Sequence, residues 1–249
     1  MKVMAKKLGE LNIKIFADGA EKASMIAASK DPLIKGLTTN PTLMRKAGVT
    51  DYAGFAKEVL AEVTTKPISF EVFSDDFTEM ERQARIINSW APNVYVKIPI
   101  TNTKQISSAP LIAKLANEGV KLNVTAILTT AQVAEVAKVL NPKVPAIISV
   151  FAGRVADTGV DPIPLMQESK AILASANAGP STKGIWELLW ASSRELLNIY
   201  QAEEVGADII TVTPEILKKS EMVGLDHREL SLQTVKMFYD DGQKVGYTL

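Results

Sequence analysis

The feature that most constrains the fold of this chain is a repeated alternation between two kinds of segment. Short apolar or β-branched runs alternate with longer segments in which apolar residues recur at three- and four-residue spacings. Such runs are typical of buried strands, and the longer segments are typical of amphipathic helices. The short runs are Asn12–Asp18, Ile34–Thr39, Pro67–Phe73, Val94–Pro99, Lys121–Ala126, Pro145–Phe151, Ile185–Ser192 and Asp208–Thr213. The helical segments include Tyr52–Val63, Asp75–Ser89, Ser108–Asn117, Ala131–Leu140, Leu165–Ala176 and Arg194–Val205.

Eight strand–helix repeats in succession predict a closed parallel barrel. The short runs end roughly 28 residues apart on average, which suits a βα unit. The total length of 249 residues fits one such domain. We therefore predict an α/β fold with a single (β/α)8 TIM barrel over about residues 12–220, all within one domain of residues 1–249.

Two parts of the sequence fall outside the simplest repeat. The widest interval between runs contains turn-rich stretches at Asp161–Pro164 and Asn177–Ser181, which we expect to add loop or a short extra element. After the eighth run, Ser231–Val245 has the pattern of an amphipathic helix. It predicts a C-terminal helical tail over about residues 221–249.

The composition narrows the class of ligand. Twenty-eight basic residues balance 28 acidic ones without a block of like charge, so the chain lacks the electrostatic footprint of a protein that binds nucleic acid or an anionic membrane. The chain has no cysteine and one histidine, His227, which leaves little material for a thiolate nucleophile or a metal cluster. No secretory signal follows the basic start. We expect a cytoplasmic protein that binds a small molecule and needs no metal or cofactor.

Polar side chains interrupt the predicted strands. A strand buried on both faces is expected to be apolar almost throughout, because an unpaired buried polar group costs about 1–3 kcal/mol. In the run Val94–Pro99, alternation places Val94 and Val96 on the face toward the helices and Tyr95 and Lys97 on the face toward the barrel axis. Lys97 is therefore expected to point into the barrel.

Other polar residues lie where the predicted strands end. They are Asp18, Asn40, Glu71, Asn123, Thr125, Ser149, Ser192 and Thr213. Active sites of parallel barrels lie at the carboxyl ends of the strands, so this ring is expected to form a catalytic floor. For single residues such as Asn40, Ser149 and Thr213, an equally good interpretation is that they cap helices or fill a polar layer of the core.

A lysine inside a strand suggests a specific chemistry. Burial disfavours the charged ammonium form, which makes the free amine available as a nucleophile toward a carbonyl. A nearby carboxylate opposes this effect, so we expect Asp18 and Glu71 to lie where they relay protons without forming a salt bridge with Lys97. The chemistry that these residues indicate is imine formation with an aldehyde or ketone.

At these residues the chain resembles a known family, the transaldolases. The similar motifs, in order, are Ala17-Asp18-Gly19, Thr38-Thr39-Asn40-Pro41, Val94-Tyr95-Val96-Lys97-Ile98-Pro99, Leu122-Asn123-Val124-Thr125 and Ser149-Val150-Phe151-Ala152-Gly153-Arg154. Each motif lies at the end of a predicted strand, and the resemblance covers about residues 12–220.

The resemblance implies a role for each residue of the ring. Lys97 forms the Schiff base with the donor ketose, and Asp18 moves the proton when the carbon–carbon bond breaks or forms. Glu71 and Thr125 orient the water that enters and leaves the carbinolamine. Substrate contacts are implied for Asn40, Asn123, Ser149 and Phe151 around the intermediate, and for Arg154, Ser192 and Arg194 around a phosphate. The substrates implied are sugar phosphates.

Three functions remain open on this reading. Related aldolases that release a three-carbon unit tend to carry Gln and Tyr where this chain has Glu71 and Phe151, so the resemblance favours transfer of a dihydroxyacetone unit to an acceptor aldose phosphate. The alternative is a lyase of the fructose-6-phosphate aldolase kind with the same imine. A catalytically silent sugar-phosphate-binding barrel is disfavoured because Lys97, Asp18 and Glu71 are all present.

Three further expectations concern the periphery. The chain resembles the compact branch of the family, which implies a homo-oligomer built through the C-terminal helix. Trp186 and Trp190 either pack in the core or narrow the acceptor pocket. Asp75-Asp76 precedes a helical pattern with Glu79, which favours a helix N-cap over a metal site.

Overall fold

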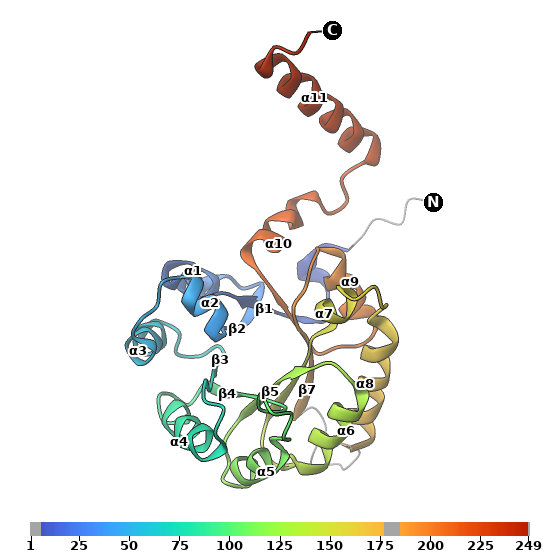
Figure 1. Cartoon of the computed structure of the whole chain (residues 1–249). Helices are drawn as coiled ribbons and strands as arrows, with labels where there is room; N and C mark the ends of the chain where they lie inside the picture. The colour runs from blue at the N-terminus through green and yellow to red at the C-terminus, as the bar shows by residue number, and fades with distance from the viewer. Residues whose placement is uncertain (1–5, 177–184, 249) are drawn as a thin grey trace.

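The computed structural model of the chain describes residues 6–176 and 185–248. Its eight parallel strands pair in chain order and close into a barrel (Figure 1). The strands are β1 Lys14–Asp18, β2 Ile34–Thr38, β3 Ile68–Glu71, β4 Val94–Pro99, β5 Leu122–Ile127, β6 Ala146–Val150, β7 Trp186–Trp190 and β8 Ile209–Val212. Pairing of β1 with β8 completes the ring. The predicted (β/α)8 fold is confirmed, and each predicted run coincides with one strand.

Helices surround the barrel (Figure 1). They are α1 Lys22–Lys30, α2 Pro41–Lys46, α3 Tyr52–Glu62, α4 Phe77–Asn88, α5 Ala109–Asn117, α6 Thr130–Val139, α7 Ala152–Ala156, α8 Ile163–Ala176, α9 Leu197–Glu204, α10 Pro214–Lys218 and α11 His227–Val245. Two short 3₁₀ helices, η1 Leu8–Glu10 and η2 Lys219–Met222, complete the described elements. All the helices named from the sequence pattern are present.

The widest interval between predicted strands does contain an extra element. The short helix α7 precedes α8 between β6 and β7. Asp161 marks a turn, as expected, and its carboxylate accepts from the Ile163 amide at the start of α8, 2.9 Å away. The other predicted turn-rich stretch, Asn177–Ser181, lies outside the described residues.

The apolar side chains of the strands form two separate layers. Val94, Val96 and Ile98 have no exposed surface and belong to the main core between the strands and the helices. A second, smaller cluster fills the inside of the barrel and includes Phe16, Ile147, Leu189 and Ile209, with Tyr95 packed against it. Because Tyr95 packs against the inner cluster and its neighbours Val94 and Val96 belong to the outer one, Tyr95 points inward as predicted. Lys97, two residues later on the same strand, has the same direction.

Trp186 and Trp190 both pack in the core. Trp190 has no exposed surface and Trp186 is 6% exposed, and both belong to the layer between strands and helices. Neither lines the cavity described below. The interpretation that they fill the core is therefore confirmed.

The acidic pair Asp75-Asp76 serves local structure, as predicted. Asp76 is the N-cap of α4 and accepts from the Glu79 amide at 2.9 Å. Asp75 accepts from the backbone amide and hydroxyl of Thr103, both at 2.7 Å. These contacts tie the start of α4 to the loop after β4.

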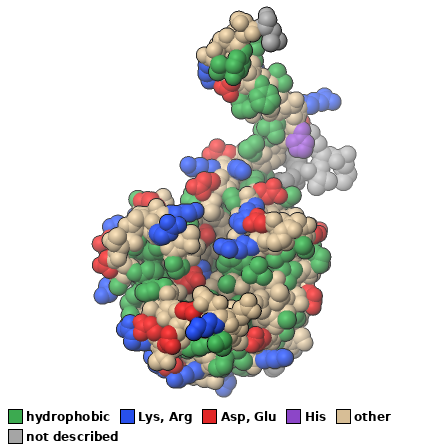
Figure 2. All heavy atoms as spheres, in the orientation of Figure 1, with side chains coloured by type: hydrophobic (Ala, Val, Ile, Leu, Met, Phe, Trp, Pro, Cys, Tyr) green, Lys and Arg blue, Asp and Glu red, His purple; other side chains and the backbone are tan. Residues whose placement is uncertain are grey.

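The predicted C-terminal tail is a helix that projects away from the barrel (Figure 1). It begins at His227, four residues before the predicted start, because Asp226 caps it through the Arg228 amide. None of its side chains is buried, and Val235, Phe238 and Tyr239 are 60–66% exposed. Hydrophobic side chains are visible along the projecting helix (Figure 2). No helix among the described residues is long and apolar enough to cross a lipid bilayer.

Candidate active site

Lys97 lies near the carboxyl end of β4 and points into the barrel. It is 6% exposed, and its register partners are Glu71 on β3 and Asn123 on β5. Its Nζ donates to the backbone carbonyl of Thr39, 3.1 Å away. The sequence prediction of an inward, buried amine is confirmed.

One expectation about Lys97 was wrong. Its Nζ lies 3.2 Å from Oε2 of Glu71, so the two residues do form a salt bridge. The cause is strand register: Glu71 and Lys97 stand opposite each other on neighbouring parallel strands, so their side chains leave the sheet on the same face. The pair places a proton acceptor directly beside the amine.

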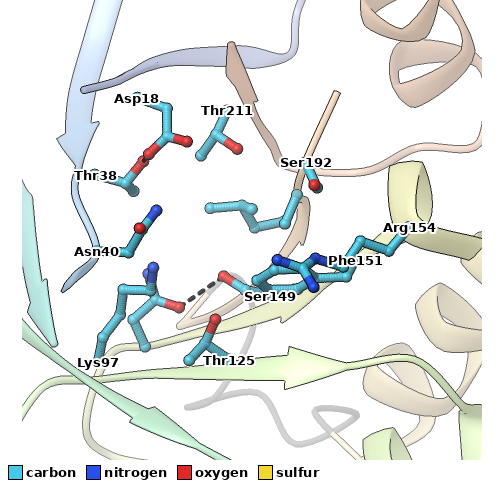
Figure 3. Close-up of a pocket in the computed structure, with 13 residues that line it drawn as sticks. Asp18, Thr38, Asn40, Lys97, Thr125, Ser149, Phe151, Arg154, Ser192 and Thr211 are labelled. Atoms are coloured by element: carbon cyan, nitrogen blue, oxygen red, sulfur yellow. Dashed lines mark hydrogen bonds between the residues drawn. The ribbon is translucent and has the colours of Figure 1, made fainter. Parts of the chain in front are cut away.

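Asp18 ends β1 and points toward the same cavity as Lys97 (Figure 3). Its Oδ1 accepts from the Thr38 hydroxyl at 2.8 Å. Burial raises the pKa of Asp18 above its ordinary value, an effect that the charge of Lys97 and the Thr38 hydrogen bond partly oppose. A carboxylate whose pKa is raised is a stronger proton acceptor than an ordinary aspartate.

A buried hydrogen-bonded row crosses the floor of the site from β6 to β3. The Ser149 hydroxyl donates to Asn123 Oδ1 at 2.6 Å, and Asn123 Nδ2 donates to Ser69 Oγ at 3.0 Å. These bonds fix the orientation of the Asn123 amide beside Lys97. In contrast, Oγ1 of Thr125 is buried and has no hydrogen-bond partner among the described residues. It lines the cavity and is available to a bound group.

These side chains surround a cavity of about 90 Å³ at the carboxyl ends of the strands (Figure 3). Its lining consists of Asp18, Thr38, Asn40, Lys97, Asn123, Thr125, Ser149, Phe151, Arg154, Leu189, Ala191, Ser192 and Thr211. Nine of the predicted site residues are in this set. Glu71 is not, although it contacts Lys97, and Arg194 is not either.

Asn40 fits both interpretations that the sequence left open. Its Oδ1 caps α2 by accepting from the Leu43 amide at 3.0 Å. The same side chain lines the cavity. Ser149 likewise belongs to both the buried row and the cavity wall.

Two arginines lie at the rim, and their surroundings differ. Arg154 lines the cavity, with its guanidinium over the ring of Phe151 at 5.4 Å from the centroid. Arg194 is paired with Asp157, with Nε 2.9 Å from Oδ1, and it donates to Ser192 Oγ at 3.0 Å. Of the two, Arg154 is the cation that faces the cavity, and Arg194 holds the Ser192 hydroxyl.

Two threonines lie near the end of β8, and for Thr213 the structure agrees with the second interpretation, a place at a helix start rather than in the catalytic floor. Thr213 is at the N-cap position of α10, outside the cavity, whereas Thr211 lines it. β8 ends at Val212, so Thr213 is already past the strand. The missed signal was the alternation along β8, in which Thr211 follows the inward-facing Ile209 by two residues.

The fold and this cluster define a class of protein. It is a (β/α)8-barrel enzyme whose polar site, at the carboxyl ends of the strands, contains a buried lysine beside carboxyl groups. The family model "Transaldolase/Fructose-6-phosphate aldolase" matches residues 15–248. The chain belongs to this family.

Curated relatives agree with the family. A probable transaldolase of Bdellovibrio bacteriovorus is 33% identical over 232 residues, which cover 93% of this chain and 98% of the relative. A probable transaldolase of Sphingopyxis alaskensis is 30% identical and covers 95% of this chain and all of the relative. Among solved structures, the α subunit of tryptophan synthase from Campylobacter jejuni matches with a TM-score of 0.56 at 14% identity. It covers 85% of this chain and 90% of that chain. This last likeness concerns the fold alone.

Proposed function

We propose that the enzyme transfers a dihydroxyacetone unit from a ketose phosphate, such as sedoheptulose 7-phosphate or fructose 6-phosphate, to an aldose phosphate through an imine on Lys97. One observation carries the proposal: the buried amine of Lys97 lines the cavity 3.2 Å from Glu71, with Asp18 lining the same cavity. An amine held beside a proton acceptor is the arrangement that imine formation with a ketone needs.

Glu71 moves the first proton. It takes a proton from the Lys97 ammonium, and the free amine then attacks the ketone carbon to give a carbinolamine. Glu71 returns the proton to the carbinolamine hydroxyl, which leaves as water and gives a protonated imine. The unpartnered Thr125 hydroxyl is suited to hold that water.

Asp18 moves the second proton. Its carboxylate takes the proton from the hydroxyl beside the scissile bond, the carbon–carbon electrons flow into the imine, and an aldehyde leaves. The remaining enamine attacks the acceptor aldehyde, and Asp18 returns its proton to the new alkoxide. Because burial raises the pKa of Asp18, its carboxylate is a stronger base for the first of these proton transfers than an ordinary aspartate.

The remaining cavity residues bind substrate. Asn40, Asn123 and Ser149 offer hydrogen bonds to the hydroxyls of the three-carbon unit. Arg154 and Ser192 bind the phosphate, because a guanidinium and a hydroxyl together match that anion. Arg194 supports this site through its bond to Ser192.

Transfer is favoured over release by the ring of Phe151. It lines the cavity without a hydroxyl that could direct water to the enamine. The three-carbon unit then waits for an acceptor. A lyase activity of the fructose-6-phosphate aldolase kind is the alternative outcome of the test below.

We also propose a homo-oligomer formed through α11. The helix exposes Leu232, Val235, Phe238 and Tyr239, each at least 47% exposed in the single chain. Such a row of apolar side chains on a projecting helix is typical of a subunit contact. Size measurement of the full chain and of a Phe238→Asp variant tests this; one unchanged molecular mass for both would contradict it.

Borohydride trapping tests the proposed chemistry. The enzyme is mixed with fructose 6-phosphate and borohydride, digested and analysed by mass; the adduct is expected on the peptide that contains Lys97. A Lys121→Met variant is the matched control, because Lys121 contacts the Tyr95 ring and the Pro92 carbonyl and is not part of the cavity lining. An adduct on another lysine would contradict the assignment.

The effect of an acceptor aldose phosphate on turnover distinguishes transfer from release. Formation of glyceraldehyde 3-phosphate from fructose 6-phosphate is followed with and without erythrose 4-phosphate. Turnover that depends on the acceptor supports the transferase. Equal turnover in both conditions supports the lyase.

A further inference from the structure

The hydrogen-bond ladder between β2 and β3 stops before β3 does. The two strands pair only at Leu37 with Ile68 and at Thr38 with Ser69, whereas β3 continues beside β4 as far as Glu71. Along the ladder, the Leu37 amide donates to the Pro67 carbonyl and the Thr39 amide donates to the Ser69 carbonyl. A regular parallel ladder repeats this bond every two residues.

The next pair of hydrogen bonds between β2 and β3 is missing, and the residues at these positions explain why. By the same spacing, the amide of residue 41 would donate to the Glu71 carbonyl, but residue 41 is Pro41, which has no N–H. The Glu71 amide would donate to the Thr39 carbonyl, but that carbonyl accepts from Lys97 Nζ. Both backbone groups of Glu71 on this side therefore need another partner.

Tyr52 on α3 supplies both partners with a single hydroxyl. Its Oη donates to the Glu71 carbonyl at 2.8 Å and accepts from the Glu71 amide at 2.9 Å. Burial raises the pKa of Tyr52, so the hydroxyl keeps its proton and remains a donor. The ring is held by edge or tilted contacts with Phe70 and Trp90 at 6.3 and 6.0 Å between centroids.

We propose that Tyr52 is a positioning residue for imine formation: its hydroxyl replaces the missing β2 rung, fixes the backbone of Glu71, and leaves the Thr39 carbonyl to the amine of Lys97. The inference rests on the proposed roles of Lys97 and Glu71. Without the hydroxyl, the Glu71 amide competes with Lys97 for the Thr39 carbonyl. The carboxylate of Glu71 and the amine then lose their fixed separation of 3.2 Å.

The test is Tyr52→Phe, which removes the hydroxyl and keeps the ring contacts. Enzyme and fructose 6-phosphate are mixed and quenched with borohydride at successive times. The time course gives the rate constant of imine formation, and its final amplitude gives the number of sites that can react. A purely structural role lowers the amplitude, because some molecules unfold, but leaves the rate constant of the folded molecules unchanged.

We expect the rate constant to fall about tenfold in Tyr52→Phe, the scale of a lost buried hydrogen-bond partner. Tyr200→Phe is the matched control, because that hydroxyl also bonds a backbone carbonyl, that of Lys6 at 2.7 Å, and Tyr200 does not line the cavity. Its rate constant should equal that of the wild type.

The outcomes are distinguishable. An unchanged rate constant in Tyr52→Phe, with the wild-type adduct on Lys97, overturns this inference and leaves the proposed function intact. An equal fall in Tyr200→Phe also overturns it. Absence of a Lys97 adduct in the wild type overturns the proposed function and this inference together.

Discussion

The two ends of the barrel interior differ in chemistry although the same strands build both. Four strands each carry an apolar or aromatic residue toward the amino end and a polar one two positions later. The pairs are Phe16 and Asp18, Tyr95 and Lys97, Ile147 and Ser149, and Ile209 and Thr211. The first residues of these pairs, the lower layer, pack in one apolar cluster, and the second residues, the upper layer, line the cavity.

This difference separates stability from chemistry along each strand. Side chains of the lower layer contribute to stability by burying apolar surface. Side chains of the upper layer contribute to the reaction by moving protons or binding hydroxyl groups. The two kinds of side chain are only two residues apart on the same strand, because successive inward-facing positions are separated by two residues. We therefore expect substitutions in the upper layer to lower activity while the fold is retained, and substitutions in the lower layer to lower stability while activity per folded molecule is retained.

The largest expected effect is loss of turnover in Lys97→Met. Methionine fills a similar volume but has no amine, so activity should fall at least about a thousandfold while the fold is retained. Activity assays and circular dichroism measure the two quantities. Insoluble or unfolded protein would instead indicate that the upper layer is structural.

The second prediction concerns the lower layer, where we expect a loss of stability without a loss of activity. Phe16 is 2% exposed, and Gly36 opposite it leaves room for the ring: a methyl group on Gly36 would lie 2.5 Å from a ring carbon. Phe16→Ala should lower the free energy of unfolding by about 3–5 kcal/mol, because it leaves a cavity in the packed interior. Urea titration measures this. Activity per folded molecule should be preserved, and its loss at unchanged stability would break the comparison.

A smaller effect is expected at the rim, in Gly153→Ala. A Cβ at Gly153 would lie 1.7 Å from the backbone oxygen of Ser192, whose φ of 65° already departs from the ordinary range. Helix α7, which carries Arg154, must then move away from the residues that follow β7. We expect KM for a phosphorylated substrate to rise about tenfold, with kcat changed much less.

Gly9→Ala is the matched control for the rim, because nothing lies within 4 Å of a Cβ built there. Its KM should equal that of the wild type. If KM rose equally in both variants, or stayed unchanged in Gly153→Ala, the close approach of Gly153 to Ser192 would have no role in phosphate binding.

The smallest expected effect is the pH dependence of stability at Asp18. Burial raises the pKa of Asp18 in the folded chain above its ordinary value, so the folded state binds this proton more tightly than the unfolded state does. Its contribution to stability is most favourable below the unfolded pKa and declines as pH rises through the folded pKa.

Asp18→Asn removes this titration and keeps an oxygen for the Thr38 hydroxyl. The variant should be more stable than the wild type at pH 8, by an amount typical of a single substitution, about 1 kcal/mol. The difference should shrink as pH falls toward 4. Unfolding curves at the two pH values measure it, and a difference that does not vary with pH would contradict the prediction.

The sequence predicted the parts of the molecule that depend on strand period. Alternation along β4 was enough to direct Lys97 inward, and turn chemistry was enough to assign Asp76 as a cap. The residues 12–176 and 185–220 that the structure describes follow the predicted order of strands. A single domain over the whole chain stays a prediction.

What the sequence did not predict depends on contacts across the fold. The salt bridge between Glu71 and Lys97 follows from the register of β3 against β4, which neither strand specifies alone. Arg194 was assigned to a phosphate, but Asp157, 37 residues earlier, already pairs with it. Helix α1 was not named because only Met25 of its nine residues is buried, which leaves almost no apolar stripe to detect.

The projecting helix α11 has a thermodynamic consequence. An isolated helix of its 19 residues is only marginally stable in water, and none of its side chains is buried against its own barrel. If neighbouring copies cover it, as proposed, its order depends on mass action. Dilution should then unwind this segment first, and the melting temperature should rise with enzyme concentration.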